Sequence, residues 1–377
     1  MNILCRRKSL DKSDLHQNPV KIEDWGWNTQ WEEAFSLYRT QGLDCGRVIR
    51  ESHHIYTLIT AQGECLCEVS GAFQYKAIGP QDYPVTGDWC ALRRAGKGHG
   101  VLEARLPRKT AFSRQTAGNR SDEQVLAANI DTIGLVFAID GGRNFTKGSL
   151  ERYYTLAKHS GAEIQILLNK ADLCSEEERS WALNSAAEAA PGCRILLVSA
   201  LTGLGLDQCN RKKGETIALT GPSGVGKSTL INSLSGTNLQ KTRSQRENDK
   251  RGRHTTTHRQ MFRLPSGALF IDTPGMKELQ MWGDLQDVDA VFTDIVQIAE
   301  ACQFSDCRHE QEPGCALQAA LQSGELDERR YANYLKLKRE IDFLNRRQND
   351  QAKRNEKDRW KKIAKFQKEM TKERRNR

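Results

Sequence analysis

Apolar and polar residues alternate along the middle of the chain in a pattern that predicts strands and helices in turn. Three apolar runs, at 131–140, 163–168 and 193–200, have the composition of buried strands, and amphipathic helical segments at 150–161 and 175–190 separate them. A fourth strand, ETIALT, precedes a helix and then a hairpin-like segment, MFRLPSGALFID. Because strands that alternate with helices usually pair in parallel, we expect a doubly wound α/β domain.

Residues 43–110 carry a different pattern. Short runs of β-branched and aromatic residues are separated by Gly, Asp and Pro turns: RVIRE, HIYTLITA, ECLCEVSGAF, DWCALRRA and HGVLEARLP. Five strands in about 70 residues suit a small antiparallel barrel, and an OB-fold is compatible with that size. An SH3-like barrel or a fragment of a sandwich would give similar periodicity.

The flanking segments are more polar. Residues 1–24 are expected to be poorly ordered, whereas Trp31, Phe35 and Tyr38 recur at helical spacing behind Asn28, a predicted cap. We expect this short helix to pack its aromatic stripe against the domain that follows. Farther along, 113–128 is predicted to be a polar connector, 296–344 to be helical with a cysteine-rich interruption, and 345–377 to be a charged helix or a disordered tail.

The net charge of +9 is concentrated at one end. Residues 345–377 hold 14 Lys and Arg against 5 Asp and Glu, so residues 1–344 carry 43 of each sign. A neutral body with a cationic appendage is typical of a protein that meets a polyanion through one element. Removing the tail should therefore flatten the salt dependence of that binding, unless the tail is only a solvated, partly helical appendage.

Nothing in the sequence predicts export or membrane insertion. No apolar run approaches the roughly 18–20 residues that cross a bilayer, and MNILCRRKSLDKSD lacks the apolar stretch of a signal peptide. We therefore expect a cytoplasmic protein without membrane contact. Eleven cysteines in such a chain favour reduced thiols or metal ligands over disulfides. Cys65 and Cys67, two apart on one predicted strand, are expected to share a face of the barrel.

Residues 221–228 read GPSGVGKS and match the phosphate-binding motif GxxxxGK[ST], between a predicted strand and a predicted helix. The glycines let the backbone turn so that its N–H groups and the helix N-terminus face a phosphate chain. Lys227 can reach the β- and γ-phosphates, and the Ser228 hydroxyl can ligate Mg²⁺. The predicted nucleotide-binding residues of this segment are Gly221, Pro222, Ser223, Gly224, Val225, Gly226, Lys227, Ser228 and Thr229.

Two turns at the ends of predicted strands indicate guanine as the base. Asn169, Lys170 and Asp172 form an NKxD turn, in which the Asp172 carboxylate would accept from N1–H and the 2-amino group of guanine. Ser199 and Ala200 follow the next strand. In isolation NKAD would be a plain helix-capping loop, but with the second turn and a phosphate loop in one sheet it favours GTP over ATP.

Downstream elements complete the expected site. Asp272 and Gly275 belong to a DTPG motif at a strand end, where the carboxylate can hold the Mg²⁺ shell and the amide can sense a γ-phosphate. Thr256 is the favoured switch threonine and Mg²⁺ ligand, although two neighbouring threonines offer the same hydroxyl. Met276 replaces the glutamine that orients water in many GTPases, so slow intrinsic hydrolysis is expected. His254 is a candidate to position the water; a phosphate or RNA contact is the alternative. The predicted catalytic residues are Lys227, Thr256 and His254.

Cys302, Cys307, His309 and Cys315 are spaced C-x4-C-x-H-x5-C. Three thiolates and an imidazole within fourteen residues predict a closed tetrahedral zinc site. The site is expected to be structural, with one zinc per chain, because four protein ligands leave no open position for water.

The order of the motifs is unusual. NKAD and SA precede the phosphate loop, and GRHTTT and DTPG follow it, whereas in ordinary small GTPases the phosphate loop comes first. The sequence thus resembles circularly permuted GTPases. With a barrel before that region and a Cys₃His segment after it, the chain resembles the RsgA family of small-ribosomal-subunit biogenesis GTPases over about residues 40–340.

The resemblance implies roles for the parts of the chain. It assigns Asn169, Lys170 and Asp172 to guanine recognition and Ser199 and Ala200 to base support. It implies that the barrel and the zinc segment dock on 16S rRNA of the 30S subunit, which stimulates hydrolysis of GTP to GDP and phosphate late in maturation. We expect a monomer with no DNA partner. The expected parts are an extension with a short helix (1–42), an OB-fold-like barrel (43–112), a permuted α/β P-loop GTPase domain (113–295), a helical zinc domain (296–344) and a basic tail (345–377).

Two other functions stay open. An rRNA-binding assembly scaffold, whose nucleotide pocket tunes affinity without productive turnover, is compatible with Met276. A P-loop kinase or ATPase would need adenine preference, which NKAD argues against.

Overall fold

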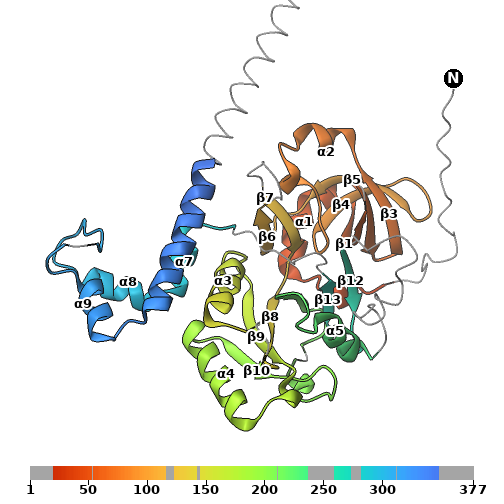
Figure 1. Cartoon of the computed structure of the whole chain (residues 1–377). Helices are drawn as coiled ribbons and strands as arrows, with labels where there is room; N and C mark the ends of the chain where they lie inside the picture. Colours follow the sequence, from red (N-terminus) through yellow and green to blue (C-terminus); the bar gives the residue numbers. More distant parts are fainter. Residues whose placement is uncertain are drawn as a thin grey trace, which may run out of the picture.

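The computed structural model describes residues 20–52, 54–115, 123–141, 145–209, 211–236, 259–272, 282–310 and 312–347. Figure 1 shows three regions: a barrel, a sheet with helices around it, and a group of helices formed by the last described residues. No helix in these ranges combines the length and apolar character needed to cross a bilayer.

The barrel has five strands, β1 (Asp44–Ser52), β2 (Ile55–Thr60), β3 (Gly63–Val69), β4 (Trp89–Arg94) and β5 (His99–Arg105). Their order is β1-β2-β3-β5-β4, and β4 pairs again with β1 to close the ring, with only β3 and β5 parallel. The prediction of a five-stranded barrel is confirmed. Cys65 and Cys67 are both buried, with their sulfurs 3.6 Å apart, so the prediction of a shared face also holds.

One predicted barrel strand is too long. β3 ends at Val69, and the following residues form α2 (Gly71–Lys76), with a short η2 (Pro80–Asp82) before β4. The Ser70 hydroxyl accepts from the backbone N–H of Phe73 at 3.0 Å, which caps the helix. Phe73 then packs into the barrel core. The apolar residue that suggested a continuing strand is therefore the buried face of a helical turn.

The short helix that the sequence predicts before the barrel is present. Helix α1 (Thr29–Thr40) starts at Asn28, whose side chain accepts from the N–H groups of Gln30 and Trp31. Trp31 and Phe35 are buried with Trp89 of the barrel. Residues 20–24 were expected to be poorly ordered, but the structure places Ile22–Trp25 in a short 3₁₀ helix, η1.

The sheet contains parallel strands in the order β10-β9-β8-β11-β13, as predicted, and β12 joins its edge in antiparallel orientation. β12 also pairs with β1, so the barrel and the sheet are continuous. The strands are β8 (Thr132–Ala138), β9 (Glu163–Asn169), β10 (Arg194–Leu197), β11 (Thr216–Thr220), β12 (Arg259–Arg263) and β13 (Leu269–Asp272). The surrounding elements are α3 (Lys147–Lys158), η3 (Ala171–Leu173), α4 (Glu176–Ala189), η4 (Leu206–Cys209) and α5 (Lys227–Ser235).

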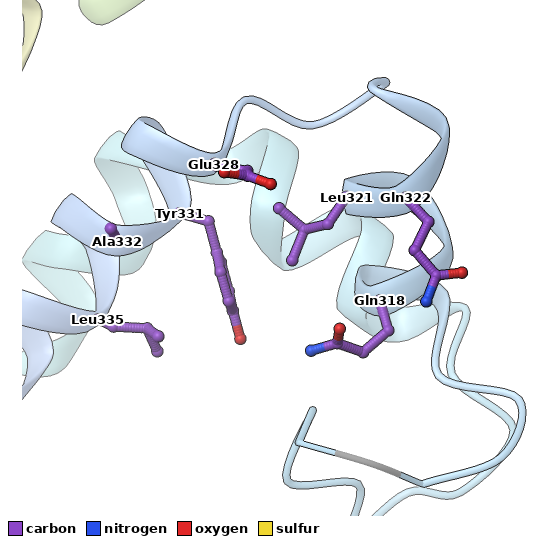
Figure 2. A pocket seen from close by; sticks show the side chains of 7 residues that line it. All are labelled: Gln318, Leu321, Gln322, Glu328, Tyr331, Ala332 and Leu335. Atoms are coloured by element: carbon purple, nitrogen blue, oxygen red, sulfur yellow. The ribbon is translucent and has the colours of Figure 1, made fainter.

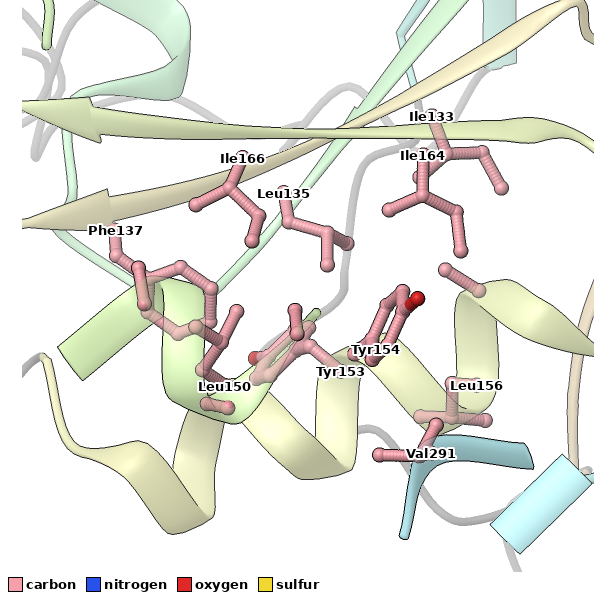
Figure 3. Packing of buried hydrophobic residues seen from close by; sticks show 14 of the residues in the cluster. Ile133, Leu135, Phe137, Leu150, Tyr153, Tyr154, Leu156, Ile164, Ile166 and Val291 are labelled. Atoms are coloured by element: carbon pink, nitrogen blue, oxygen red, sulfur yellow. The ribbon is translucent and has the colours of Figure 1, made fainter. Parts of the chain in front are cut away.

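Both faces of the sheet are apolar. Along β8, Ile133, Leu135 and Phe137 belong to the core shared with α3 and α4, whereas Val136 and Ala138 belong to the core shared with α5. Figure 3 shows the first core, in which strand side chains from β8 and β9 face those of α3. This alternation confirms that helices cover the sheet on two sides.

Residues 113–128, predicted to be a connector, contribute instead to a two-stranded sheet of β6 (Ala111–Gln115) and β7 (Glu123–Ala128). Its polar residues bond to one another across the strands. The Ser113 hydroxyl donates to Glu123 at 2.6 Å, and Arg114 donates to the Gln124 side chain at 3.0 Å. The polar residues of β6 and β7 are therefore explained by hydrogen bonds between the two strands and do not indicate a loop.

The last described residues form α7 (Leu285–Val291), α8 (Thr293–Glu300), α9 (Ala316–Ser323) and a helix over 328–347. These helices share the core of α3 and α4, and Val291 lies beside Leu156 in Figure 3. Arg330 pairs with the buried Glu151 of α3 at 2.5 Å. The helical group is thereby tied to the face of the sheet that α3 and α4 cover.

Candidate functional site

The predicted nucleotide motifs meet at one edge of the sheet. β9 ends at Asn169, β10 ends two residues before Ser199, and β11 is followed by Gly221. Because these strands are parallel, their carboxyl ends lie at the same edge, where ligands bind in open α/β sheets. Segments that are far apart in sequence therefore converge.

Asn169 joins the three segments through its side chain. Its amide Nδ2 donates to the backbone oxygen of Val225 in the phosphate loop at 2.8 Å. Its Oδ1 accepts from the backbone N–H of Ala200 at 3.0 Å. Asn169 is almost fully buried, so both bonds are made away from solvent. The first residue of the NKxD turn is thus a structural bridge between the phosphate loop and the SA turn.

At two positions of the phosphate loop, neighbouring atoms leave no space for a side chain. Gly221 has a φ of +147°, and a Cβ there would lie 2.1 Å from the oxygen of Val136. Gly226 has a φ of +94°, and a Cβ there would lie 2.4 Å from Nδ2 of Asn169. The Lys227 ammonium lies over the loop and donates to the oxygens of Gly221 and Pro222, each at 2.6 Å.

The NKxD turn carries two charged side chains, Lys170, which forms an ion pair, and Asp172. Lys170, in a left-handed conformation with φ +66°, places its ammonium 2.5 Å from the carboxylate of Asp140. Asp172 lies in η3 and is half-buried. Within the described ranges no residue makes a hydrogen bond or ion pair with the Asp172 carboxylate. That carboxylate can accept two hydrogen bonds from a base.

Hydrogen bonds hold the SA turn, Ser199 and Ala200, in place. The Ser199 hydroxyl oxygen is buried and accepts from the N–H groups of Leu201 and Thr202 at 3.3 and 3.1 Å. The Ala200 carbonyl accepts from the Ser233 hydroxyl of α5 at 2.5 Å. The turn is therefore fixed both to itself and to the helix that follows the phosphate loop.

The predicted Mg²⁺ and switch residues are only partly placed. Ser228 is half-buried in the first turn of α5, and Asp272 is the last residue of β13, which pairs with β11. Thr229 is likewise half-buried on α5. Thr256, His254, Gly275 and Met276 lie outside the described residues.

The four predicted metal ligands come together. The ligand atoms of Cys302, Cys307, His309 and Cys315 all lie within 4.8 Å of one another. Nδ1 of His309 is 3.5 Å from the sulfur of Cys302 and 3.6 Å from that of Cys315, and these two sulfurs are 4.0 Å apart. Bonds of about 2.3 Å to sulfur and about 2.0 Å to nitrogen would place tetrahedral ligands about 3.5–3.8 Å apart. The arrangement could therefore hold a metal ion.

Backbone groups support this cluster. Burial opposes ionisation of Cys302, but hydrogen bonds from the N–H groups of Ala316 and Leu317, together with those from the Cys315 and Cys307 thiols, outweigh it and lower the pKa of the Cys302 thiol. Gln318 of α9 donates to the His309 oxygen at 2.7 Å, which holds the histidine in its left-handed conformation. The start of α9 thus favours a thiolate.

Two cavities lie away from the nucleotide motifs. One, of about 320 Å³, is bordered by α9 and the helix over 328–347, and Figure 2 shows Tyr331 and Leu321 on opposite walls. The other, of about 450 Å³, lies between α1, the barrel and the amino ends of the sheet strands. The motif residues line neither cavity.

Comparison with known proteins identifies the family. The profile of the RsgA GTPase family matches residues 105–282. The small ribosomal subunit biogenesis GTPase RsgA 2 of Lactiplantibacillus plantarum is 41% identical over 84% of this chain and 89% of its own length. The chain belongs to the RsgA family of ribosome-biogenesis GTPases. The predicted resemblance is therefore confirmed, as is GTP hydrolysis as the family's activity.

Solved structures agree with this assignment. YjeQ from Thermotoga maritima is similar with a TM-score of 0.58 and 25% identity, over 79% of this chain and 98% of its own. YloQ, described as a circularly permuted GTPase, has a TM-score of 0.55 and 23% identity, over 80% and 95%. The motif order and the fold thus indicate the same permuted arrangement.

Sequence reasoning missed Asp140. By sequence it is only the last residue of an apolar run, yet its carboxylate pairs with Lys170 of the NKxD turn. The signal that could have found it is its place: it follows the strand next to β9 in a parallel sheet, so it lies at the motif edge.

Proposed function

We propose that this RsgA-family protein binds GTP and Mg²⁺ at the motif edge of the sheet and hydrolyses GTP to assist late maturation of the small ribosomal subunit. The observation that carries the proposal is the Asn169 bridge, because one buried side chain bonds both the phosphate loop and the SA turn. Relatives that share about two fifths of its residues are named for small ribosomal subunit biogenesis.

Chemical roles follow from the residue types. Lys227 and the loop amides would stabilise charge that develops on the phosphates. Ser228, Thr256 and Asp272 would hold Mg²⁺, which neutralises the phosphate oxygens. Thr256 would order the switch, and His254 would position the attacking water, the role that a glutamine has in many GTPases where this chain carries Met276. Asp172 would select guanine, with Lys170 and the Ser199–Ala200 turn supporting the base.

The remaining parts have proposed roles in docking. The strand order β1-β2-β3-β5-β4 with closure onto β1 supports an OB-fold for residues 43–112. We propose that the chain is divided into the parts that the sequence predicts. Zinc held by Cys302, Cys307, His309 and Cys315 would fix the loop before α9. We propose that these two parts contact 16S rRNA, and that the protein is a cytoplasmic monomer without DNA or membrane partners.

The experiment is a GTP hydrolysis assay of the full chain with purified small and large ribosomal subunits added separately. We expect turnover to rise with small subunits and to stay at the intrinsic rate with large ones. Equal stimulation by both would contradict the choice of subunit, and no turnover in any condition would contradict the proposed enzyme.

A second candidate is an rRNA-binding scaffold that uses nucleotide to tune affinity. Met276, where many GTPases carry glutamine, favours it. Hydrolysis that stays flat as small subunits are added, while nucleotide changes subunit affinity, would support this alternative over the first.

A further inference from the structure

The Lys170–Asp140 pair connects the NKxD turn to the neighbouring strand. The Lys170 ammonium and the Asp140 carboxylate are 2.5 Å apart, with 30% and 19% of the side chains exposed. Asp140 follows β8, and Lys170 follows β9, so the pair joins the ends of two adjacent parallel strands. Partial burial makes such a pair less sensitive to solvent screening than a surface pair.

The backbones that carry the two side chains are held together as well. The N–H of Ile139 donates to the Asn169 oxygen at 3.0 Å. The Cys174 thiol donates to the Ile139 oxygen at 2.7 Å, from the far side of the turn. The residue before Asp140 is thus bonded at both its polar groups, and the ion pair is fixed in position from both strands.

This pairing determines which charge stays available. Lys170 and Asp172 are two residues apart in one turn, and the lysine could neutralise either carboxylate. It pairs with Asp140, and among the described residues the Asp172 carboxylate keeps no hydrogen-bond or ion-pair partner. A carboxylate tied to an ammonium would have to break that pair before accepting from a base.

We propose that Asp140 is a specificity-determining positioning residue, which holds Lys170 away from Asp172 and so keeps the Asp172 carboxylate available for guanine. The inference rests on the proposed guanine-nucleotide function. Without Asp140, the Lys170 ammonium turns to Asp172. Guanine then loses two hydrogen bonds to the Asp172 carboxylate, from N1–H and from the 2-amino group. Hypoxanthine lacks the 2-amino group, so it loses only one.

The test measures binding of GDP and of inosine diphosphate to the full chain by calorimetric titration. We expect Asp140→Ala to weaken GDP binding about fivefold, the size of a partly exposed ion pair, and to weaken inosine diphosphate less. The double variant Asp140→Ala/Lys170→Ala should regain the wild-type ratio of the two affinities, because the competing cation is gone. Glu188→Gln, which removes the exposed Lys147–Glu188 pair between α3 and α4, is the matched control and should change neither affinity.

The outcomes are distinct. If Asp140→Ala weakens the binding of both nucleotides equally, and Asp140→Ala/Lys170→Ala does not restore that binding, Asp140 has a merely structural role and the proposal is overturned. If Asp140→Ala does not fold, Asp140→Asn, which keeps the shape and removes the charge, carries the same expectation. If the preference of the wild type for GDP over inosine diphosphate is unchanged in both Asp140→Ala and Asp140→Asn, this inference alone is overturned. A wild-type protein without any preference would overturn the proposed guanine specificity as well.

Discussion

The nucleotide motifs and the cysteine cluster are built in opposite ways. The first are gathered from segments between Asp140 and Asp272 at one edge of a sheet, where the buried Asn169 bonds two of them. The second lies within Cys302–Cys315, and its ligands meet through a short loop and the start of α9. A gathered site depends on the whole fold, whereas a contiguous one depends on its own ligands. Changes in one should therefore affect the molecule differently from changes in the other.

The largest effect is expected from Lys227→Ala. The ammonium lies over the phosphate loop, and its removal takes away charge that phosphoryl transfer requires, so GTP hydrolysis should fall by about a hundredfold or more. The measurement is single-turnover phosphate release. RNA binding in low salt should persist, and Lys212→Ala, an exposed lysine outside the loop, is the control. Loss of hydrolysis and RNA binding together would mean that the two functions cannot be separated.

Cys307→Ser tests the contiguous site. The variant should lose the zinc that we propose for this cluster and, with it, the order of the loop before α9, so amide protection in α9 should fall by about a hundredfold. Protection in α5 should stay as in the wild type, because α5 belongs to the other core. Metal analysis and hydrogen exchange give the two readouts. Equal loss of protection in α5 would contradict the separation of the two sites.

Asn169→Ala tests the gathered site. The change leaves the buried N–H of Ala200 and oxygen of Val225 without their partner, at a cost of about 2–4 kcal/mol in the free energy of unfolding. Urea unfolding measures it, with Gln74→Ala on the exposed face of α2 as the control. A loss confined to nucleotide affinity, at unchanged stability, would contradict a bridging role.

The smallest effect concerns the link between the two regions. Nδ1 of His159, the residue that caps the C-terminus of α3, lies 2.8 Å from the Asp287 carboxylate on α7. This hydrogen bond raises the pKa of His159 above 6.5 despite burial. A raised folded-state pKa adds stability below pH 6.5 that is lost as pH rises through the folded value. After solvent screening we expect less than about 1 kcal/mol. Unfolding of wild type and His159→Gln at pH 5.5 and 8.5 measures it; an identical pH dependence would exclude the contribution.

Much of the architecture is predictable because it follows from periodicity. The parallel sheet, the barrel and α1 each have a clear pattern of buried positions. The cysteine cluster was predictable because its four ligands are close in sequence. Residues of the phosphate loop and the NKxD turn were identified by motif, and the parallel strand order then brings them to one edge.

Other features of the fold depend on contacts between distant residues, which produce no periodic pattern in the sequence. The strand pair β6 and β7 is polar because its side chains bond across the strands, as Ser113 does with Glu123. The β1–β12 pairing, which merges barrel and sheet, joins residues such as Arg50 and Gln260 that no local pattern relates. Asp140 meets Lys170 only because β8 and β9 are neighbours.

Substituting Asp172 tests the central claim, a guanine site assembled from permuted segments, most directly. In Asp172→Asn the side-chain amide can donate to a base that carries a carbonyl at position 2, while its oxygen still accepts from N1–H. Binding of GDP and xanthosine diphosphate is titrated against wild type and variant. We predict that the wild type prefers GDP and the variant prefers xanthosine diphosphate. An unchanged GDP affinity in the variant would contradict the account.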